Sequence, residues 1–201
     1  MNKLAVLISG GGSNLQSIID STKTGILKDI AEVAVVISSN PDAFGLQRAK
    51  NENIKNFSLD YKNMQREEYD RRIFNILKNC KIDLICMAGY MKKLSDIIVN
   101  EYKKKILNIH PALLPKFGGK GMYGHFVHEA VVKAKEQKSG ATVHFADENY
   151  DTGEIIIQGY VDVGENDTPE IVAEKVLKIE HKIYPEAIKK VIEYNKNKLI
   201  I

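Results

Sequence analysis

The stretch KLAVLISGGGSN, residues 3–14, sets the first folding unit of the chain. It opens with a short, largely apolar run, a pattern typical of a buried strand. Consecutive glycines then allow the sharp turn that a strand needs before it reverses into a helix. Ser13 and Asn14 follow, and both residue types commonly cap a helix N-terminus. The stretch therefore predicts a strand, a tight turn and a helix, the opening unit of an α/β fold.

The same alternation continues along the chain. Short apolar runs predict further strands, and apolar residues at helical spacing predict the helices between them. The expected strands are 33–37, 56–59, 83–87 and 105–109, and the expected helices are 43–51, 65–80 and 96–103. Such alternation is typical of a parallel sheet with helices on both faces and right-handed crossovers.

The next part of the chain has a different order of elements. A glycine-rich segment, 115–124, predicts a mobile surface loop, and a helix is expected at 126–136. Two strands, 141–145 and 154–161, are joined by a short polar loop. Because so short a link cannot make a parallel crossover, an antiparallel pair is expected.

A long helix is expected to start at Thr168, with a kink at Pro185. Its expected inner face consists of Ile171, Val172, Val176, Ile179, Ile183, Ala187 and Val191. The predicted fold class is therefore α/β: an open, mostly parallel twisted sheet with helices on both faces and an antiparallel C-terminal strand pair. The length of 201 residues suits a single domain over 1–201.

The composition narrows the class of function. The chain is 44% hydrophobic and 27% charged, as in ordinary globular proteins, and its net charge is +3. This surplus is too small for a nucleic-acid binder, so no nucleic-acid partner is expected. No apolar stretch approaches the length of a membrane span, and no secretory signal is evident, so we expect a cytoplasmic protein without a membrane partner. Cys80 and Cys86 form no CxxC pair, and no metal site is expected.

Three sequence features suggest chemistry, and the first is the glycine turn at 9–14. Glycines let the backbone approach a ligand closely, and the helix that follows offers unpaired N–H groups, so phosphate is the natural occupant. The turn lacks the Gly-Lys-Ser/Thr of a Walker motif and the third glycine of a dinucleotide fingerprint. The alternative is a plain strand-to-helix turn with no ligand.

The second feature is LNIHP at 107–111. Asn108 and His110 are two residues apart at a strand end, so both side chains can point to the same side. An amide donor beside an imidazole suits stabilisation of a developing oxyanion. The alternative is a hydrogen-bonded structural histidine, which is also the role expected for His144 in its alternating apolar strand.

The third feature is the acidic loop DENYDTG at 147–153. One of its carboxylates can orient His110 and stabilise its charged form. The alternative is a solvated acidic turn. All three features follow strands, and open α/β sheets bind ligands at the carboxyl ends of their strands. We therefore expect the three to converge on one cleft.

Several segments together resemble the phosphoribosylglycinamide formyltransferase family. They are LISGGGSNLQ, SSNPDAFGLQRA, MAGYMKKLS, ILNIHPALLPKF, VHFADENYDTG and EHKIYP. The NIHP-x-LLP pattern is shared by folate-dependent formyltransferases in general, whereas the SGxGSNL start and the EHxIYP end are more particular to the glycinamide enzymes. The resemblance covers nearly the whole chain and implies the formyltransferase fold.

The resemblance also implies a reaction in purine biosynthesis. The formyl donor would be 10-formyltetrahydrofolate, a co-substrate, and the acceptor would be the glycyl amine of phosphoribosylglycinamide. Matched residue by residue, Asn108 and a protonated His110 would stabilise the oxyanion, and Asp151 would hold His110 and assist proton transfer. The implied substrate contacts are Gly12, Ser13 and Asn14 at the phosphate and Glu180 near the amine. The implied folate contacts are Met91, Lys92, Lys93 and Leu94 together with Asn108, and Arg66 near the acidic tail.

Two features depart from the family pattern. Gly11 stands where other members often carry a larger polar residue, which implies a more flexible turn. The segment 117–125 is lengthened and glycine-rich, which makes it a candidate lid, and Lys120 is expected to lie in solvent.

Rival functions remain. The acceptor can be another amine, on an initiator tRNA or an amino sugar, although the tRNA enzyme is expected to carry a further C-terminal domain. Hydrolysis of the formyl folate is expected to need an additional N-terminal domain. A non-catalytic phosphate- or nucleotide-binding module would not require Asn108, His110 and Asp151 to converge. A nicotinamide dehydrogenase would need an acidic residue where Ser38 and Ser39 stand.

Overall fold

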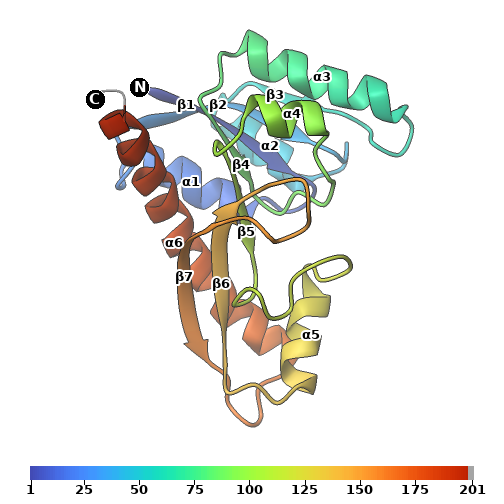
Figure 1. Ribbon diagram of the computed structural model, residues 1–201, viewed down its shortest axis with the longest axis vertical. Helices are drawn as coiled ribbons and strands as arrows, with labels where there is room; N and C mark the ends of the chain where they lie inside the picture. The colour runs from blue at the N-terminus through green and yellow to red at the C-terminus, as the bar shows by residue number, and fades with distance from the viewer. Residues whose placement is uncertain (199–201) are drawn as a thin grey trace.

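A computed structural model of the chain describes residues 1–198, which form a seven-stranded sheet in the order β3-β2-β1-β4-β5-β6-β7 (Figure 1). The strands are β1 (Asn2–Ile8), β2 (Ala31–Ser38), β3 (Asn56–Ser58), β4 (Leu84–Met87), β5 (Ile106–His110), β6 (Lys138–Phe145) and β7 (Ile155–Asp162). Strands β1 to β5 are parallel, whereas β6 runs antiparallel to both β5 and β7. The predicted fold class is confirmed.

The helices cover both faces of the sheet, as expected. They are α1 (Ser13–Lys23), α2 (Phe44–Asn51), α3 (Arg66–Asn79), α4 (Asp96–Glu101), α5 (His125–Lys133) and α6 (Pro169–Lys198). Successive residues of β1 point to opposite faces, so Leu4, Val6 and Ile8 join the core under α1 and α6. Ala5 and Leu7 join the second core, under α3 and α4. No helix of residues 1–198 has the length and apolarity needed to cross a membrane.

The start and the inner face of the final helix follow the prediction with one exception, whereas the predicted kink at Pro185 stays a prediction. Thr168 caps α6, because its hydroxyl accepts a hydrogen bond from the Ile171 N–H at 3.4 Å. Val172 and Val176 are fully buried as expected, but the prediction for Ile171 is wrong, since its side chain is 40% exposed. Ile171 precedes Val172 by one residue, and one residue turns a helix by about 100°, so the side chain points away from the sheet.

Pro185 lies inside α6, and the helix continues through it. A proline has no N–H, so the carbonyl of His181, four residues earlier, loses its helical donor. The Ser17 hydroxyl of α1 donates to this carbonyl at 2.7 Å. The hydrogen bond satisfies the orphaned carbonyl and joins α1 to α6 close to the glycine turn.

The start of α1 differs from the sequence expectation. Neither Ser13 nor Asn14 caps the helix: the N-cap residue is Gly12, with φ 71°, and no side chain among residues 1–198 makes a capping hydrogen bond. The left-handed conformation of Gly12 completes the turn, so Ser13 already lies in the first helical turn. The first N–H groups of α1 are consequently left without side-chain partners.

The sheet order places this turn at a favourable point for a ligand. From β1 the chain proceeds to β2 and β3 on one side, and it then returns to β4 on the other side of β1. The carboxyl ends of β1 and β4 therefore flank a topological switch point, where open α/β sheets bind their ligands. The end of β5, with His110, is the next strand end along this edge.

Candidate active site

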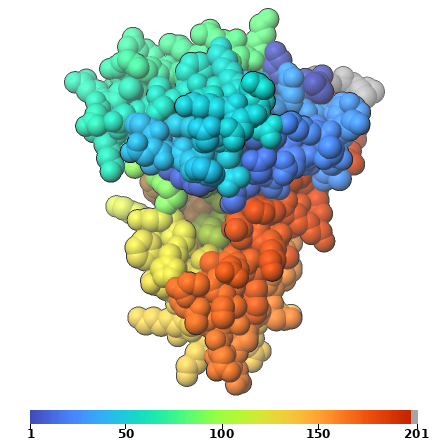
Figure 2. Space-filling view, turned by 180° about the vertical axis from the view of Figure 1, so that it is seen from behind, coloured from blue at the N-terminus to red at the C-terminus, as the bar shows by residue number. Residues whose placement is uncertain are grey.

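A cleft of about 530 Å³ opens at this edge of the sheet. Each of the predicted regions contributes to its lining: Asn14 after β1, Met91 after β4, His110 at the end of β5, Asp151 after β6, and Glu180 from α6. In the space-filling view the surface is recessed between the α5 and α6 regions, and atoms from the middle of the chain form the floor (Figure 2). The expected convergence on one cleft is therefore present.

The Asp151 carboxylate is the centre of the polar cluster. Its Oδ2 atom accepts a hydrogen bond from the Gly119 N–H at 2.9 Å and lies 3.6 Å from His110 Nδ1. Its Oδ1 atom lies 3.5 Å from Asn108 Nδ2 and 3.5 Å from His144 Nε2. One carboxylate thus links the side chains of two adjacent strands to the glycine-rich loop.

The environment of His110 favours its neutral form in this state of the cleft. Burial lowers the pKa of His110, and the nearby His144 acts in the same direction. The Asp151 charge and the Phe117 carbonyl raise this pKa, but not enough to reverse the shift. His110 Nε2 donates to the Phe117 carbonyl at 2.8 Å, so in the neutral ring Nδ1 is unprotonated and faces Asp151. The protonated form implied by the family resemblance thus requires additional negative charge in the cleft.

Asp151 is held in its charged form. Burial would raise the pKa of Asp151, but the polar contact with the His144 ring, the proximity of His110 and the hydrogen bond from the Gly119 N–H outweigh it and lower the pKa. Asp147, in the same loop, accepts hydrogen bonds from the Thr152 hydroxyl at 2.9 and 3.0 Å and from the Asn149 N–H at 2.9 Å. It therefore stabilises the loop and stands apart from the cluster.

His144 makes a contact that the sequence did not predict. Its Nδ1 donates to the Phe145 carbonyl at 2.8 Å, which leaves Nε2 as an acceptor for Asn108 Nδ2 at 3.1 Å. The side chain is 2% exposed, as expected for a structural histidine of β6, and it also contacts the cluster directly. Only the pairing of β5 with β6, which sets His144 opposite Asn108, reveals this contact.

A second buried histidine lines the cleft from α5. His128 is 5% exposed, and its Nδ1 has no hydrogen-bond partner within residues 1–198. Burial, together with the neighbouring His125 and His110, lowers the pKa of His128 to about 4. The imidazole is therefore neutral near pH 7, and no sequence signal distinguished it from His125, which is half exposed.

The end of the cleft nearest the glycine turn carries a buried pair. Asn14 Nδ2 donates to Glu180 Oε2 at 2.5 Å, and both residues are buried. Burial raises the pKa of Glu180, although the hydrogen bond from Asn14 opposes the shift. Asn14 Oδ1 has no partner in the part of the chain that the structure describes. Ser13 lines a separate, smaller crevice instead of this cleft.

The segment after β4 forms the apolar wall. Met91, Lys92, Lys93 and Leu94 all line the cleft, as predicted, next to Val99 of α4. The Met91 N–H donates to Ser9 Oγ at 2.9 Å, which ties this wall to the glycine turn. A flat, partly polar ring system fits such a surface, because backbone groups lie beside apolar side chains.

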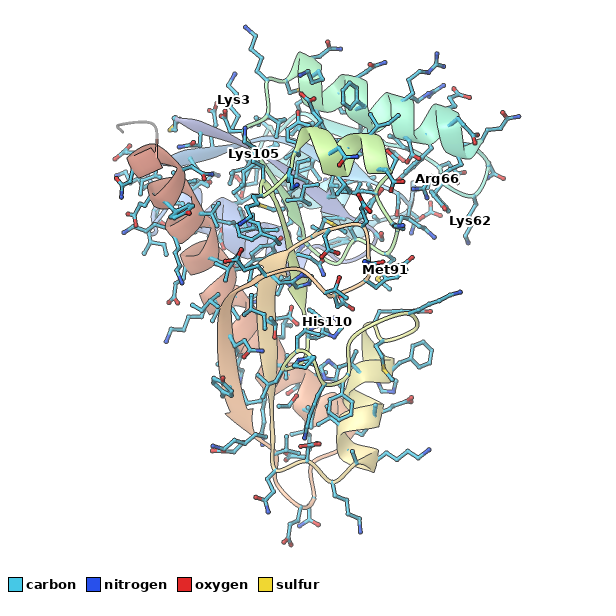
Figure 3. All side chains as sticks on the ribbon, in the orientation of Figure 1. Lys3, Lys62, Arg66, Met91, Lys105 and His110 are labelled. Carbon is cyan, nitrogen blue, oxygen red and sulfur yellow. The ribbon has the colours of Figure 1, made fainter. Side chains whose placement is uncertain are left out.

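Arg66 lies outside the lining of this cleft. Its guanidinium donates to Asp70 at 2.6 Å, to the Tyr61 hydroxyl at 3.0 Å and to the Lys93 carbonyl at 2.6 Å. Figure 3 shows Arg66 beside Lys62 at the outer edge of the molecule, with Met91 nearer the centre. In this arrangement Arg66 holds the apolar wall through the Lys93 carbonyl. The contact of Arg66 with a folate tail stays a prediction.

The glycine-rich segment 117–125, the candidate lid, contributes Gly119, Gly121, Met122, Tyr123 and Gly124 to the lining. Lys120 is exposed and lies outside the lining, as expected for a solvated lysine. The Phe117 carbonyl accepts the hydrogen bond from His110 Nε2, so a ligand that accepts from Nε2 must displace this carbonyl. Within residues 1–198, no group of three His, Cys, Asp or Glu side chains is arranged to hold a metal ion.

Comparisons with known proteins agree with this geometry. The family model described as formyl transferase matches residues 2–188. The chain is 41% identical over 190 residues to the phosphoribosylglycinamide formyltransferase of Haemophilus influenzae, covering 94% of this chain and 86% of that one. The crystal structure of glycinamide ribonucleotide transformylase 1 from Symbiobacterium toebii superimposes with a TM-score of 0.88 at 37% identity, over 96% of this chain and 88% of that one.

Other relatives are longer than this chain. A phosphoribosylglycinamide formyltransferase described as chloroplastic, from Arabidopsis thaliana, is 40% identical over 95% of this chain, which spans 65% of that relative. A Drosophila melanogaster relative named trifunctional purine biosynthetic protein adenosine-3 is 41% identical over 92% of this chain, which spans 14% of it. The similarity therefore concerns one part of these larger proteins.

Proposed function

The chain belongs to the formyl transferase family, and we propose that it transfers the formyl group of 10-formyltetrahydrofolate to the glycyl amine of 5-phosphoribosylglycinamide, a step of purine biosynthesis. The observation that carries the proposal is the contact of Asn108, His110 and Asp151 within one cleft, which the first turn of α1 also lines. A module that only bound phosphate would have no need of this cluster.

The two substrates have separate places in the proposal. The N–H groups at the start of α1 bind the phosphate at Gly12, Ser13 and Asn14, because a helix N-terminus favours anions. Glu180 contacts the glycinamide end from α6. The pterin lies against the wall formed by residues 91–94, with Asn108 at its reactive end, and Arg66 serves the acidic tail.

The chemistry then needs charge stabilisation and one proton transfer. The amine nitrogen forms a bond to the formyl carbon, and the carbonyl oxygen becomes negatively charged. Asn108 Nδ2 and His110 Nε2 donate to this oxygen in place of their present acceptors, and its charge favours protonation of His110. Asp151 stabilises that imidazolium and takes part in moving a proton from the attacking nitrogen to the leaving nitrogen of the folate, whose bond to the formyl carbon breaks.

The wider setting is part of the same proposal. The partners are small molecules, no metal takes part, and the activity is cytoplasmic. We treat residues 1–201 as a single formyltransferase domain, which is supported by the one continuous sheet that runs through the described residues.

A formyl transfer assay tests this function. Purified protein is mixed with 10-formyltetrahydrofolate, with and without phosphoribosylglycinamide, and the folate absorbance is followed. We expect turnover only with the glycinamide, and a loss of about 100- to 1,000-fold in His110→Ala and in Asn108→Ala, because each removes one oxyanion donor. Turnover without an acceptor would indicate hydrolysis, and absence of turnover in both conditions would indicate another amine acceptor or a binding module.

A further inference from the structure

The hydrogen bonds of the glycine turn are unevenly distributed between its carbonyl and N–H groups. The Gly10 carbonyl accepts from the Gly45 N–H at 3.0 Å, the Gly11 carbonyl from Arg48 Nε at 2.9 Å, and the Gly12 carbonyl from the Gln16 N–H at 3.0 Å. In contrast, within residues 1–198 none of the N–H groups of residues 10–15 donates to a protein acceptor. The turn therefore keeps its carbonyls engaged and its donors available.

The planarity of the peptide bond makes this arrangement directional. A carbonyl and the N–H of the next residue point in opposite directions across one trans peptide. Arg48 holds the Gly11 carbonyl toward α2, so it also holds the Gly12 N–H toward the opposite side, where an anion would accept from it. Gly45, at the start of α2, does the same for the Gly11 N–H.

The glycine sequence makes such restraint necessary. A Cβ atom at Gly10 or Gly11 would meet no atom of residues 1–198 within 4 Å, so packing does not restrain these two residues and hydrogen bonds must hold their peptides. Gly12 is better restrained, because its Cβ position would lie 2.8 Å from the Gly45 Cα atom. The peptide between Gly11 and Gly12 therefore depends on Arg48 for its orientation.

Arg48 also brings an uncompensated charge to the turn. Its guanidinium contacts Gln16 Oε1 at 3.3 Å and lies 5.1 Å from the centre of the Phe44 ring. No carboxylate in the described part of the chain lies within ion-pair distance of it, and Asp20 is bound instead by Gln16 Nε2 at 3.0 Å. Arg48 and Ser13 line a small crevice and are absent from the lining of the main cleft.

We propose that Arg48 is a positioning residue for the substrate phosphate: it fixes the Gly11–Gly12 peptide so that the N–H groups at the start of α1 face a phosphate monoester. The inference rests on the proposed function for the identity of the substrate. The binding of a phosphate dianion, however, is testable without any formyl transfer.

The first experiment follows binding of inorganic phosphate by the amide resonances of Gly11 and Gly12 in the free protein. Arg48→Met removes the donor and the charge, and we expect phosphate affinity to fall by about 10-fold or more, as for loss of a charged hydrogen bond. Arg48→Lys keeps the charge but has no donor at the Nε position, so its affinity should fall by at least about 3-fold. Lys50→Met, which removes an exposed charge from the same helix, is the matched control and should stay within about 2-fold.

The second experiment separates positioning from a general structural effect. In steady-state kinetics, Arg48→Met should raise the KM for phosphoribosylglycinamide by about 10-fold, while kcat and the KM for the formyl folate change less than about 2-fold. The dephosphorylated glycinamide riboside should react equally well with the variant and the unmodified protein, because it has no phosphate to position.

The results that overturn the inference are specific. Unchanged phosphate affinity in both Arg48 variants would do so, as would an equal effect of Lys50→Met. An equal loss with the riboside would assign Arg48 a purely structural role and would also reject positioning. If the protein shows no formyl transfer but binds phosphate in an Arg48-dependent way, the proposed function fails and the inference stands; should Arg48→Met fail to fold, the titration with Arg48→Lys decides.

Discussion

Replacing Asp151 by asparagine removes one negative charge from the cleft with almost no change in side-chain size. The asparagine oxygen can still accept from the Gly119 N–H, which is 2.9 Å from the carboxylate in the present structure. The charge itself lies 3.6 Å from His110 Nδ1, and the side chain is 10% exposed. We therefore expect the variant to fold normally and to lose the stabilisation of a charged His110.

The magnitude follows from this distance. At the effective dielectric constant of about 20 that suits partly buried sites, two unit charges near 4 Å interact by about 4 kcal/mol, and solvent reduces the net effect to about 2–4 kcal/mol. Since each 1.36 kcal/mol is tenfold in rate, kcat should fall by about 30- to 1,000-fold. The pKa of His110 should also fall further, because the Asp151 charge is what raises it against burial.

The assay is kcat and KM for both substrates, with thermal unfolding as the measure of folding. Asp147→Asn is the matched control: this residue lies in the same loop and lines the cleft, but its carboxylate is bound by Thr152 and the Asn149 backbone. We expect near-normal turnover in the control. Turnover within about 2-fold of normal in Asp151→Asn, or an equal loss in Asp147→Asn, would refute the assigned role.

Three further outcomes are expected. Gly12→Ala should lower the free energy of unfolding by about 1–3 kcal/mol and raise the KM for the phosphorylated substrate, because φ is 71° and the Gly45 Cα lies 2.8 Å from the new methyl. Gly11→Ala, whose new methyl would meet no atom of residues 1–198 within 4 Å, should be tolerated, and equal effects of the two variants would contradict this reasoning. Ser17→Ala should lower the free energy of unfolding, measured with denaturant, by about 1–2 kcal/mol, because the His181 carbonyl then has no donor. The loss should be smaller in a Pro185→Ala background, where residue 185 again has an N–H that can donate to this carbonyl. Equal losses in the two backgrounds would reject this role of the contact. The pKa of His128 is about 4 in the folded protein, below the unfolded value of 6.5. The stability that the neutral imidazole contributes is therefore complete above pH 6.5 and is lost as the pH falls toward 4, by at most about 1.4 kcal/mol per pH unit. His128→Gln should reduce this dependence of the free energy of unfolding on pH, and an unchanged dependence would contradict the assignment to His128.

The predicted secondary structure agrees with the observed elements because buried positions carry apolar residues, which recur with the period of the strand or helix. The apolar run before the glycine turn became β1, and the helical spacing of Tyr69, Ile73 and Leu77 became the fully buried side of α3. The error at Ile171 came from the same pattern, since an apolar residue beside a buried one need not be buried itself: Ile171 is 40% exposed, whereas Ala187 and Ile188 further along α6 are both fully buried. The prediction that Ser13 or Asn14 caps the helix was wrong, because Gly12 takes the N-cap position in a left-handed conformation and Ser13 already lies in the first helical turn.

The candidate site was partly readable in the same way. Asn108 and His110 could be paired from a period of two along one strand, and the acidic loop was recognisable as a source of a carboxylate. The assignment of Asp151 over Asp147 came from resemblance, and the hydrogen bonds of Thr152 with Asp147 give it a physical reason. The contact of His144 with Asn108 could not be predicted, because it depends on the register between β5 and β6.

The local pattern of this sequence was enough to specify the α/β class, the turn after β1 and the identity of the polar side chains at the strand ends, because backbone preference and burial act over a few neighbouring residues. The contacts that join distant segments came from tertiary structure alone. They include His144 against Asn108, Glu180 against Asn14 across 166 residues, and Arg48 on the Gly11 carbonyl. Such contacts arise from how strands and helices pack, and the chemistry of the cleft depends on them because charge and hydrogen bonding act over a few ångströms in space, whatever the separation along the chain.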